Sequence, residues 1–306
     1  MADGPWRIGV VGTGRWGRLI VRDLVALGAV VSAVARSQES AAAARAMGAS
    51  VVVDTLTALA DQDGYVVATP EQTHLDIVEA LLPRGRPIFV EKPLDVDVAR
   101  AEALPPEAGG LVFVMHKWRY HPGIQALADI VRDGELGAVR GMMLERTGWG
   151  IPQREVSPIW VLAPHDLSIV LHVLGAAPYV ESAAPHPLSP PGQGVVALLR
   201  TPSRTPVSLN VSAEVPAYRR SIVVACAEGS AQLTDPMADH ILFARRGAEI
   251  EQRPVSTELP LLRELRAFLE HLTGGPPPMT ALQDEIVILR TLASLEQASH
   301  KPDGSS

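Results

Sequence analysis

The sequence predicts an α/β protein with two parts: an N-terminal doubly wound parallel sheet, and a C-terminal α+β domain on an open, mostly antiparallel sheet. Short apolar runs alternate with helical stretches up to residue 116, which is typical of parallel strands covered on both faces. A glycine-rich stretch, GTGRWG at 12–17, follows the first apolar run. After Tyr120 the regular alternation ends and proline-rich breaks appear. These patterns predict the right-handed crossovers of a doubly wound fold, followed by a second domain.

The first domain is expected at residues 1–118. Its apolar runs are interpreted as strands at 7–11, 30–35, 49–53, 64–68, 87–91 and 111–116. The segments between them have helical spacing or alanine-rich composition, and we expect helices at 15–27, 38–47, 71–82 and 95–103. Because each helix carries the chain back to the start of the next strand, these strands should be parallel.

The second domain is expected at 119–300, before a tail at 301–306. Shorter runs predict strands at 138–147, 195–199, 207–212, 221–225 and 231–233, and a proline cluster predicts a loop at 185–191. Helices are expected at 124–133, 164–174, 259–273 and 281–299. Pro164 suits the first position of its helix, which places His165 at the helix start, with Ser168 and His172 on a face away from the apolar stripe.

Composition and charge limit the function classes. Hydrophobic residues are 47% of the 306 residues, which is ample for a core, and the net charge of −7 argues against nucleic-acid binding by bulk electrostatics. The single Cys226 excludes an internal disulfide and a cysteine metal cluster, and it suits a reducing compartment. No apolar run approaches ~18 residues, and residues 1–4 show neither the charged segment nor the apolar segment expected of a secretory leader. We expect a cytoplasmic protein that binds no metal, nucleic acid or membrane.

The glycine-rich stretch predicts a dinucleotide-binding site of the Rossmann type. The first glycine permits a tight turn, the second lets backbone amides approach a pyrophosphate, and the third lets the helix pack on the strand. The helix N-terminus then favours the negative charge of the phosphates. A lone glycine pattern is weak evidence, but here strand, glycines, helix and second strand follow in order. The whole stretch is assigned to the cofactor: Gly12, Thr13, Gly14, Arg15, Trp16 and Gly17.

The end of the second strand selects the cofactor. A unit that binds NAD usually carries Asp or Glu there, on the ribose 2′-hydroxyl. This chain has Arg36 and Ser37 instead, and no acid before Glu39. Arg36 can pair with a 2′-phosphate and Ser37 can donate to it, so NADP is predicted, with NAD as the less favoured cofactor. The alternative is that Arg36 stacks on the adenine or faces solvent.

Open parallel sheets bind ligands at the carboxyl ends of their strands. Three segments end there: 68–70, 91–93 and 115–117. Lys92 in the second segment is expected near the nicotinamide. The cofactor site is completed by Thr69, Pro70, His74, Glu91 and Lys92, although His74 also suits a structural role at a helix start.

Lys92 is unusual in this composition. The chain has 27 basic residues, of which only Lys92, Lys117 and Lys301 are lysines. Arginine holds its proton in proteins, whereas burial and neighbours can tune a lysine to act as an acid or base. Lys92 at the end of a predicted buried strand is therefore a candidate proton donor to a substrate oxygen. The alternatives are codon bias, which accounts well for the arginines, and an ion pair of Lys92 with a nearby acid.

Several motifs together resemble the glucose–fructose oxidoreductase/inositol dehydrogenase (Gfo/Idh/MocA) family over most of the chain. They are GTGRWG at 12–17, ATPEQTH at 68–74, VEKP at 90–93, HKWRYHP at 116–122, GELG at 134–137 and APHDLSIVLHVLG at 163–175. The resemblance implies that Lys92 and His165 flank the substrate carbon while hydride passes to or from nicotinamide. It also implies a sugar or a nucleotide-linked keto-sugar as substrate. One departure is Val161, four residues before His165, where the family often has Asp.

The predicted function is an NADP-dependent oxidoreductase that transfers hydride between nicotinamide and a carbonyl or hydroxyl carbon of a sugar-like metabolite. Lys92, with His165, supplies the proton to the developing alkoxide. Trp149 and Trp160 suit stacking on a sugar or base, but for each of them a place in the core is the favoured interpretation. The remaining substrate contacts are assigned to Lys117, Tyr120, Arg146, Trp149 and Arg154, together with His165.

Other functions on the same scaffold stay open. They are a nicotinamide-dependent glycoside hydrolase, an imine reductase and a non-catalytic dinucleotide-binding sensor. The valine at position 161 gives weight to the sensor, because a valine cannot make the polar contact to a substrate that an aspartate at this position would make. An open antiparallel sheet has a face to bury, so a homo-oligomer formed through that sheet is expected.

Overall fold

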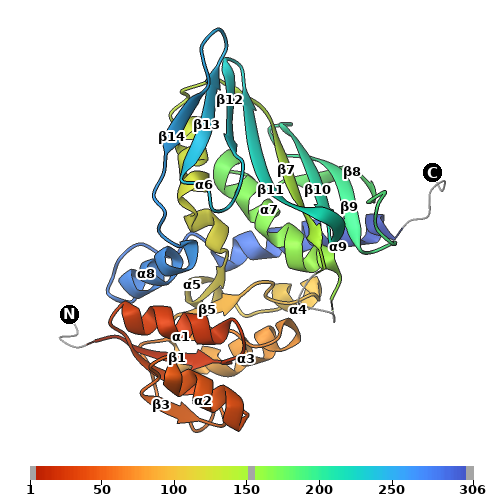
Figure 1. Ribbon diagram of the computed structural model, residues 1–306. Helices are drawn as coiled ribbons and strands as arrows, with labels where there is room; N and C mark the ends of the chain where they lie inside the picture. Colours follow the sequence, from red (N-terminus) through yellow and green to blue (C-terminus); the bar gives the residue numbers. More distant parts are fainter. Residues whose placement is uncertain (1–4, 151–155, 301–306) are drawn as a thin grey trace. The chain divides into compact units, whose positions relative to one another are not determined.

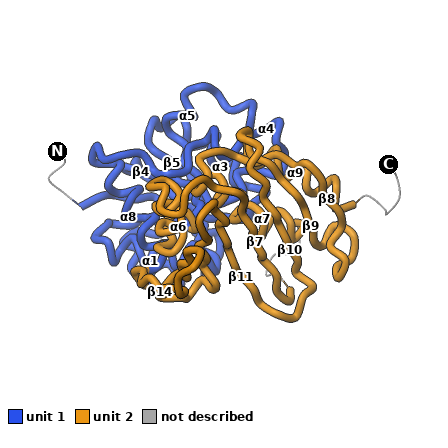
Figure 2. The backbone as a smooth tube through the Cα atoms, turned by 90° about the horizontal axis from the view of Figure 1, so that it is seen from above, with its two compact units in different colours: residues 1–117, 259–286 blue, residues 118–258, 287–306 orange. Residues whose placement is uncertain are grey.

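The computed structural model describes residues 5–150 and 156–300 (Figure 1). The chain forms two compact units, residues 1–117 with 259–286 and residues 118–258 with 287–306 (Figure 2). The stretch 259–286 therefore groups with the first unit, whereas the sequence analysis counted it with the second domain. The difference arises because α8 (Pro260–Leu272) packs against α1 (Gly17–Ala26), although the two helices are far apart in the sequence.

The first unit is built on a six-stranded parallel sheet. In spatial order its strands are β3 (Val51–Val53), β2 (Val30–Val34), β1 (Arg7–Val11), β4 (Gly64–Val67), β5 (Ile88–Glu91) and β6 (Val112–Met115). The chain winds outward from β1 first to β3 and then, through β4, to β6. The winding direction therefore reverses between β1 and β4, which is the position where such sheets bind ligands. The predicted doubly wound sheet is confirmed.

Helices of the first unit follow from apolar spacing and capping. Besides α1 and α8 they are α2 (Gln38–Ala46), α3 (His74–Leu81), α4 (Val98–Glu102) and α5 (Ala108–Leu111), with the 3-10 turns η1 (Glu71–Thr73) and η2 (Leu82–Arg84). Ile20 and Leu24 of α1 are fully buried in the core cluster. Phe268 of α8 joins the same cluster and stacks on Phe89 of β5, with 5.0 Å between ring centroids. Burial of these rings fixes α8 to the sheet.

The second unit is built on an eight-stranded sheet. In spatial order its strands are β14 (Glu251–Pro254), β13 (His240–Arg245), β12 (Gly229–Leu233), β11 (Glu214–Cys226), β7 (Val139–Trp149), β10 (Pro206–Ser212), β9 (Gly194–Arg200) and β8 (Tyr179–Pro185). Within the described residues, neighbouring strands are antiparallel except for the parallel pair β7–β10. The predicted open, mostly antiparallel sheet is confirmed.

The helices that accompany this sheet are α6 (Pro122–Arg132) and α7 (Pro158–Leu174), which pack against its strands, and most of α9 (Leu282–Ser299). The 3-10 turn η3 (Lys117–Tyr120) precedes α6. His121 caps α6 by accepting from the backbone N–H of Gly123, and Pro122 takes the first helical position. Nearly every residue of α7 is buried, so the helix is covered on most of its circumference.

The strands β8, β13 and β14 were not expected from the sequence. β8 and β14 are the two edges of the sheet, and each mixes exposed and half-buried residues with proline at its end. Edge strands need little apolar alternation, because only one side pairs and one face is wet. β13 alternates more clearly, with Ile241 and Phe243 buried, but a single short run is easily assigned to a loop.

One face of the large sheet is covered and the other is open. Leu144, Leu209 and Ile222 form a row across β7, β10 and β11 that is at most 1% exposed. The alternate row carries apolar side chains that remain partly accessible: Met143 is 53% exposed, Val196 38% and Leu198 37%. The open face therefore presents exposed apolar side chains on β7 and β9.

Candidate active site

The glycine-rich turn has the geometry of a phosphate cradle. Gly12 has φ +94°, and a Cβ atom built on it would lie 2.6 Å from the carbonyl oxygen of Ala68. A Cβ on Gly17 would lie 2.0 Å from the carbonyl oxygen of Gly12. A Cβ on Gly14, in contrast, would meet nothing within 4 Å. The outer glycines are thus required by the protein's own packing, and the middle one faces open space at the start of α1, where backbone N–H groups favour an anion.

Thr13 and Trp16, two other residues of this turn, make contacts with the rest of the first unit. Thr13 is buried, and its hydroxyl donates to the carbonyl oxygen of Ser40 at 3.2 Å. Trp16 is the N-cap residue of α1, and its ring receives the ammonium of Lys117 at 4.3 Å from the centroid. This cation–π contact joins the start of α1 to the segment that follows β6 within the first unit. Arg15 is exposed beside the turn.

The end of β2 carries the residues expected to choose between NADP and NAD. Arg36 is exposed directly after Ala35, whose N–H donates to the carbonyl oxygen of Val53. Ser37 caps α2: its hydroxyl oxygen accepts from the N–H of Ser40 at 3.1 Å, and the Ser40 hydroxyl reaches back to the N–H of Ser37. Ser37 therefore has a capping role that the sequence analysis missed, although serine at a helix start is a recognisable signal.

Lys92 directly follows β5, as predicted. The side chain is half-buried, and its backbone N–H donates to Oε2 of Glu91 at 3.2 Å. On the neighbouring strand, Thr69 follows β4, and its hydroxyl oxygen lies 2.9 Å from that of Thr73. Lys92, Thr69 and the glycine turn thus lie at the carboxyl ends of β5, β4 and β1, which are neighbours in the sheet.

His74 links two of these strand ends. It is the first residue of α3 and only 2% exposed. Its Nε2 lies 2.8 Å from the carbonyl oxygen of Thr69, and its Nδ1 lies 2.8 Å from that of Pro93. Pro70, between Thr69 and the helix, accepts from the Thr73 hydroxyl at 2.8 Å. Both ring nitrogens of His74 are thus occupied by the backbone, and a direct contact of this ring with the cofactor stays a prediction.

In the second unit the structure corrects the surroundings of His165. The helix α7 begins at Pro158, because Ser157 accepts from the N–H of Ile159 and caps it there. Pro164 is therefore inside the helix, and the expectation that His165 stands at a helix start is wrong. The capping serine and the proline after it form a stronger start signal than Pro164 alone. His165 is half-buried in the body of α7.

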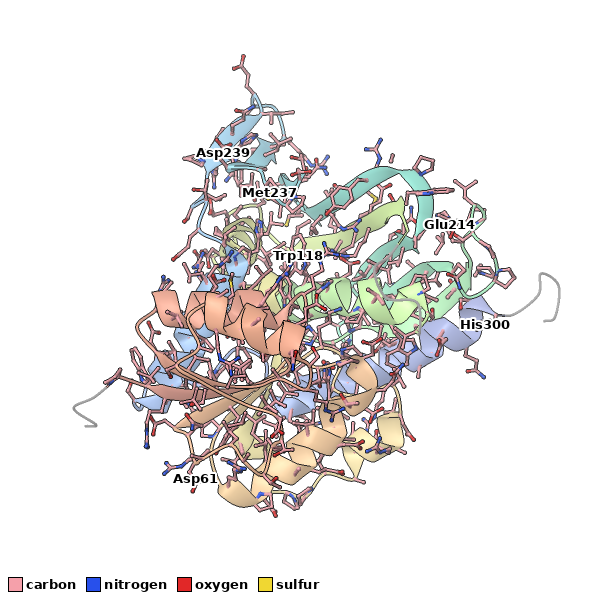
Figure 3. All side chains as sticks on the ribbon, turned by 60° about the horizontal axis from the view of Figure 1, so that its bottom comes forward. Asp61, Trp118, Glu214, Met237, Asp239 and His300 are labelled. Atoms are coloured by element: carbon pink, nitrogen blue, oxygen red, sulfur yellow. The ribbon has the colours of Figure 1, made fainter. Side chains whose placement is uncertain are left out.

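Trp118, which no sequence argument singled out, connects His165 with Arg146. Its ring lies 6.2 Å from the His165 ring at an angle of 58° and 5.3 Å from the ring of His121. The guanidinium carbon of Arg146 lies 4.7 Å from the Trp118 centroid (Figure 3 labels Trp118). Two predicted site residues of the second unit, His165 and Arg146, are thus brought to one buried indole.

Arg146 has a strong internal partner. Its Nε and Nη2 atoms donate to both oxygens of Asp166 at 2.7–2.9 Å, and both side chains are at most 2% exposed. Arg146 lies on β7 and Asp166 on α7, so the pair ties the helix to the sheet. The substrate contact of Arg146 stays a prediction beside this structural role.

Arg220 adds a second positive charge here. It lies directly across from Arg146 in the β7–β11 register, so both side chains leave the sheet on the same face. Its Nη1 donates to the carbonyl oxygens of Thr147 and Arg219, at 2.5 and 2.7 Å, and its guanidinium covers the Tyr218 ring at 4.2 Å. Burial, and then the charge of Arg146, lowers the pKa of Arg220. Only strand register could have revealed this neighbour.

His172 is part of the helix pair rather than of a proton-transfer site. Gln125 on α6 donates its side-chain N–H to Nε2 of His172 at 3.0 Å, and it also donates to the carbonyl oxygen of Arg119. Burial, followed by the charge of Arg119, lowers the pKa of His172 to about 4. The ring is thus neutral near pH 7 and serves as a hydrogen-bond acceptor.

The other predicted residues have mixed environments. Tyr120 and Val161 are buried, whereas Trp149, at the end of β7, is 71% exposed. Trp160 is 3% exposed and belongs to the core. Arg154 lies outside the described residues. In the described part of the chain no three potential metal-binding side chains lie together, and no helix there has the length and apolarity to cross a membrane.

Comparisons with known proteins place the chain in an oxidoreductase family. A family model described as an oxidoreductase family with an NAD-binding Rossmann fold matches residues 6–109. The inositol 2-dehydrogenase of Acidiphilium cryptum is 30% identical over 266 residues, which are 80% of this chain and 78% of that protein. The inositol 2-dehydrogenase of Rhizobium meliloti is 28% identical over 186 residues, and this match covers 56% of each chain. The chain thus spans about half the length of some curated relatives that it matches.

A solved structure resembles the whole chain. The UDP-N-acetylglucosamine 3-dehydrogenase of Acidithiobacillus ferrooxidans matches with a TM-score of 0.85, over 97% of this chain and 98% of that one. The sequences are 23% identical in this comparison, so the similarity shows a shared fold.

Proposed function

Because the chain belongs to the Gfo/Idh/MocA oxidoreductase family, we propose that it is an NADP-dependent oxidoreductase acting on a carbonyl or hydroxyl carbon of a sugar or nucleotide-linked keto-sugar. One observation carries the proposal: the open space at Gly14 and the side chain of Lys92 belong to strand ends on the same edge of one parallel sheet. That edge is where such sheets bind dinucleotides.

The cofactor assignment rests on the residues of the glycine turn and on Arg36. Gly14 leaves room for a pyrophosphate at the N-terminus of α1, and the exposed Arg36 after β2 suits a 2′-phosphate. Bound NADP would supply or accept the hydride. Thr69, Pro70 and Glu91, which follow or end β4 and β5, complete the proposed binding edge.

Proton transfer is assigned to Lys92. In the reductive direction its ammonium group donates a proton to the oxygen that becomes a hydroxyl, and its charge stabilises the developing alkoxide. In the reverse direction the neutral amine accepts that proton. The family resemblance assigns His165 to the same proton transfer. Lys117 and Tyr120 are proposed to hold the remainder of the substrate.

The charges near Arg146 support a substrate with an anionic group. Asp166 compensates Arg146, but among the described residues no acid forms an ion pair with Arg220. A nucleoside diphosphate carries the charge that such a site can use. The similar UDP-N-acetylglucosamine 3-dehydrogenase acts on a substrate of this kind. We therefore favour nucleotide-linked sugars over free polyols.

A second candidate function is a dinucleotide-binding sensor without turnover. It is favoured by Val161, which is buried where the family often has a carboxylate. The two candidates differ in one measurement. Both bind NADP, but only the oxidoreductase changes nicotinamide absorbance when a carbonyl substrate is present.

The test begins with titration of NADPH and NADH, followed by a screen of nucleotide-linked keto-sugars, free keto-sugars and cyclic imines at the nicotinamide band. We expect tighter binding of NADPH and oxidation of NADPH by a keto-sugar.

Lys92→Arg should lower kcat by about 10²- to 10⁴-fold, because it keeps charge and removes acid–base capacity. Lys301→Arg, near the end of the chain, is the matched control. Wild-type turnover in Lys92→Arg would contradict the assignment, and hydrolysis of a glycoside without net redox change would favour the hydrolase.

Self-association through the open face of the large sheet is proposed as well. Met143, Val196 and Leu198 are exposed apolar side chains on that face, which a second copy would bury. Met143→Glu should shift the mass measured by light scattering toward that of the monomer. Met237→Glu, on an exposed methionine outside this group, is the control.

The buried free thiol of Cys226 is compatible with the cytoplasmic location that we propose.

A further inference from the structure

The loop that carries Lys92 is held at a single peptide group. The peptide between Pro93 and Leu94 has one carbonyl oxygen and one N–H. The carbonyl oxygen lies 2.8 Å from Nδ1 of His74, and the N–H donates to Oε1 of Glu285 at 3.0 Å. His74 comes from α3 and Glu285 from the first turn of α9, so two elements remote in sequence hold the two polar atoms of one peptide.

The groups that hold this peptide are buried. His74 is 2% exposed, and Leu94 and Glu285 are completely inaccessible to solvent. Water therefore does not compete for these hydrogen bonds, and the peptide plane has a defined orientation.

Glu285 is itself oriented by a third residue. Its Oε2 lies 2.6 Å from Nε2 of His116, which follows β6 and is 0% exposed. The carboxylate thus uses one oxygen for the Lys92 loop and the other for the end of the neighbouring strand β6. β5 and β6 are paired from Ile88↔Val112 to Glu91↔Met115, so the carboxylate bridges the segments just beyond this register.

The held peptide restricts Lys92 from its C-terminal side. Only Pro93 separates Lys92 from the held peptide, and proline fixes its own φ. On the N-terminal side, Glu91 is the last residue of β5 and is paired in the sheet. The backbone of Lys92 therefore lies between a paired strand and a fixed peptide, with few torsions left to vary.

We propose that Glu285, with His74, is a positioning residue that sets the direction of the Lys92 side chain. The inference rests on the proposed function, in which Lys92 is the proton donor. A proton donor must lie within hydrogen-bond reach of the reacting oxygen, and a displacement of about 1 Å can cost a factor of about 10² in rate. Glu285 acts on this geometry through the backbone, without touching the substrate.

Three variants test the role by kinetics. Glu285→Ala removes the acceptor for the Leu94 N–H and should lower kcat by about 10- to 100-fold, with KM and the Kd of NADPH changed by less than about threefold. Glu285→Gln keeps an oxygen that can accept from Leu94 and should recover most of kcat. Glu264→Ala is the matched control, because Glu264 is equally buried in the same unit on α8. A kcat for Glu285→Ala within twofold of that control would overturn the proposal.

A second readout does not depend on turnover. Reductive methylation with ¹³C labels the three lysines and the N-terminal amine, so the Lys92 signal can be followed by NMR in a nearly empty spectrum. We expect its chemical shift or its titration midpoint to change in Glu285→Ala and to stay close to wild type in Glu285→Gln and Glu264→Ala. An unchanged Lys92 signal in Glu285→Ala would refute positioning even if the enzyme is active.

The two readouts separate the inference from the proposed function. If no carbonyl compound is turned over by the wild type, the proposed function fails, and the Lys92 signal still decides whether Glu285 orients this side chain. If Glu285→Ala does not fold, His74→Ala releases the other end of the same peptide and is judged by the same two measurements.

Discussion

Arg146 and Asp166 form a buried ion pair with three N–H···O contacts of 2.7–2.9 Å, and this pair supports the indole between Arg146 and His165. The guanidinium lies over Trp118, and Trp118 faces the His165 ring. The environment of His165, a candidate proton-transfer residue, therefore depends on a contact between β7 and α7 in which neither His165 nor Lys92 takes part.

Breaking this pair should be costly. Asp166→Ala leaves the charge of Arg146 buried without its carboxylate, and we expect a loss of about 3–5 kcal/mol in the free energy of unfolding. Replacing both partners, as Arg146→Met with Asp166→Leu, should cost less, because no buried charge remains. Denaturant titration measures both. The exposed pair Arg132–Asp129 is the control, and Asp129→Ala should cost no more than about 1 kcal/mol. A single variant as stable as wild type would contradict the account.

The glycines of the turn at 12–17 should respond differently to one added methyl group. Gly17→Ala places a Cβ 2.0 Å from a backbone oxygen, so the melting temperature should fall markedly. Gly14→Ala meets no protein atom within 4 Å and should fold normally, but it should weaken NADPH binding by about 10-fold or more, since the methyl occupies the space for the phosphates. Gly109→Ala, also in open space, should change neither quantity. Normal NADPH affinity in Gly14→Ala would place the cofactor elsewhere.

Cofactor choice should depend on the charge at position 36. Arg36→Asp removes a positive partner for a 2′-phosphate and adds a carboxylate that suits a ribose 2′-hydroxyl. We expect the Kd of NADPH to rise by at least about 10-fold and that of NADH to stay the same or fall, as measured by calorimetric titration. Arg45→Asp, at the exposed far end of α2, should change neither Kd. Equal loss of both cofactors in Arg36→Asp would instead support stacking of Arg36 on the adenine.

Acid should destabilise the protein partly through His172. Its pKa is lowered to about 4 in the folded state, first by burial, whereas an unfolded histidine titrates near 6.5. Between these values the unfolded chain binds a proton that the folded chain does not. The contribution of His172 to the free energy of unfolding is therefore fully present above pH 6.5 and is lost as the pH falls toward 4. His172→Gln should reduce the drop in melting temperature between pH 7 and pH 5. The exposed His300→Gln should leave that drop unchanged, and an unaltered drop in His172→Gln would exclude this cause.

Local patterns were sufficient to predict the parallel sheet of the first unit. Its strands are continuous apolar runs, and its glycine turn follows β1 where the pattern placed it. Lys92 also follows β5 as expected, because a strand end is set by the run itself. The start of α7 was predicted wrongly, since Pro164 competed with the stronger cap at Ser157 and Pro158.

The sequence by itself therefore determined the doubly wound sheet, the dinucleotide turn and the position of Lys92 at a strand end, because each depends on residues close together in the chain. Tertiary structure decided which distant side chains surround them. Glu285 reaches the Leu94 N–H across 191 positions, and Arg220 meets Arg146 only through the β7–β11 register. Such contacts depend on packing and register, which no local pattern of residues encodes.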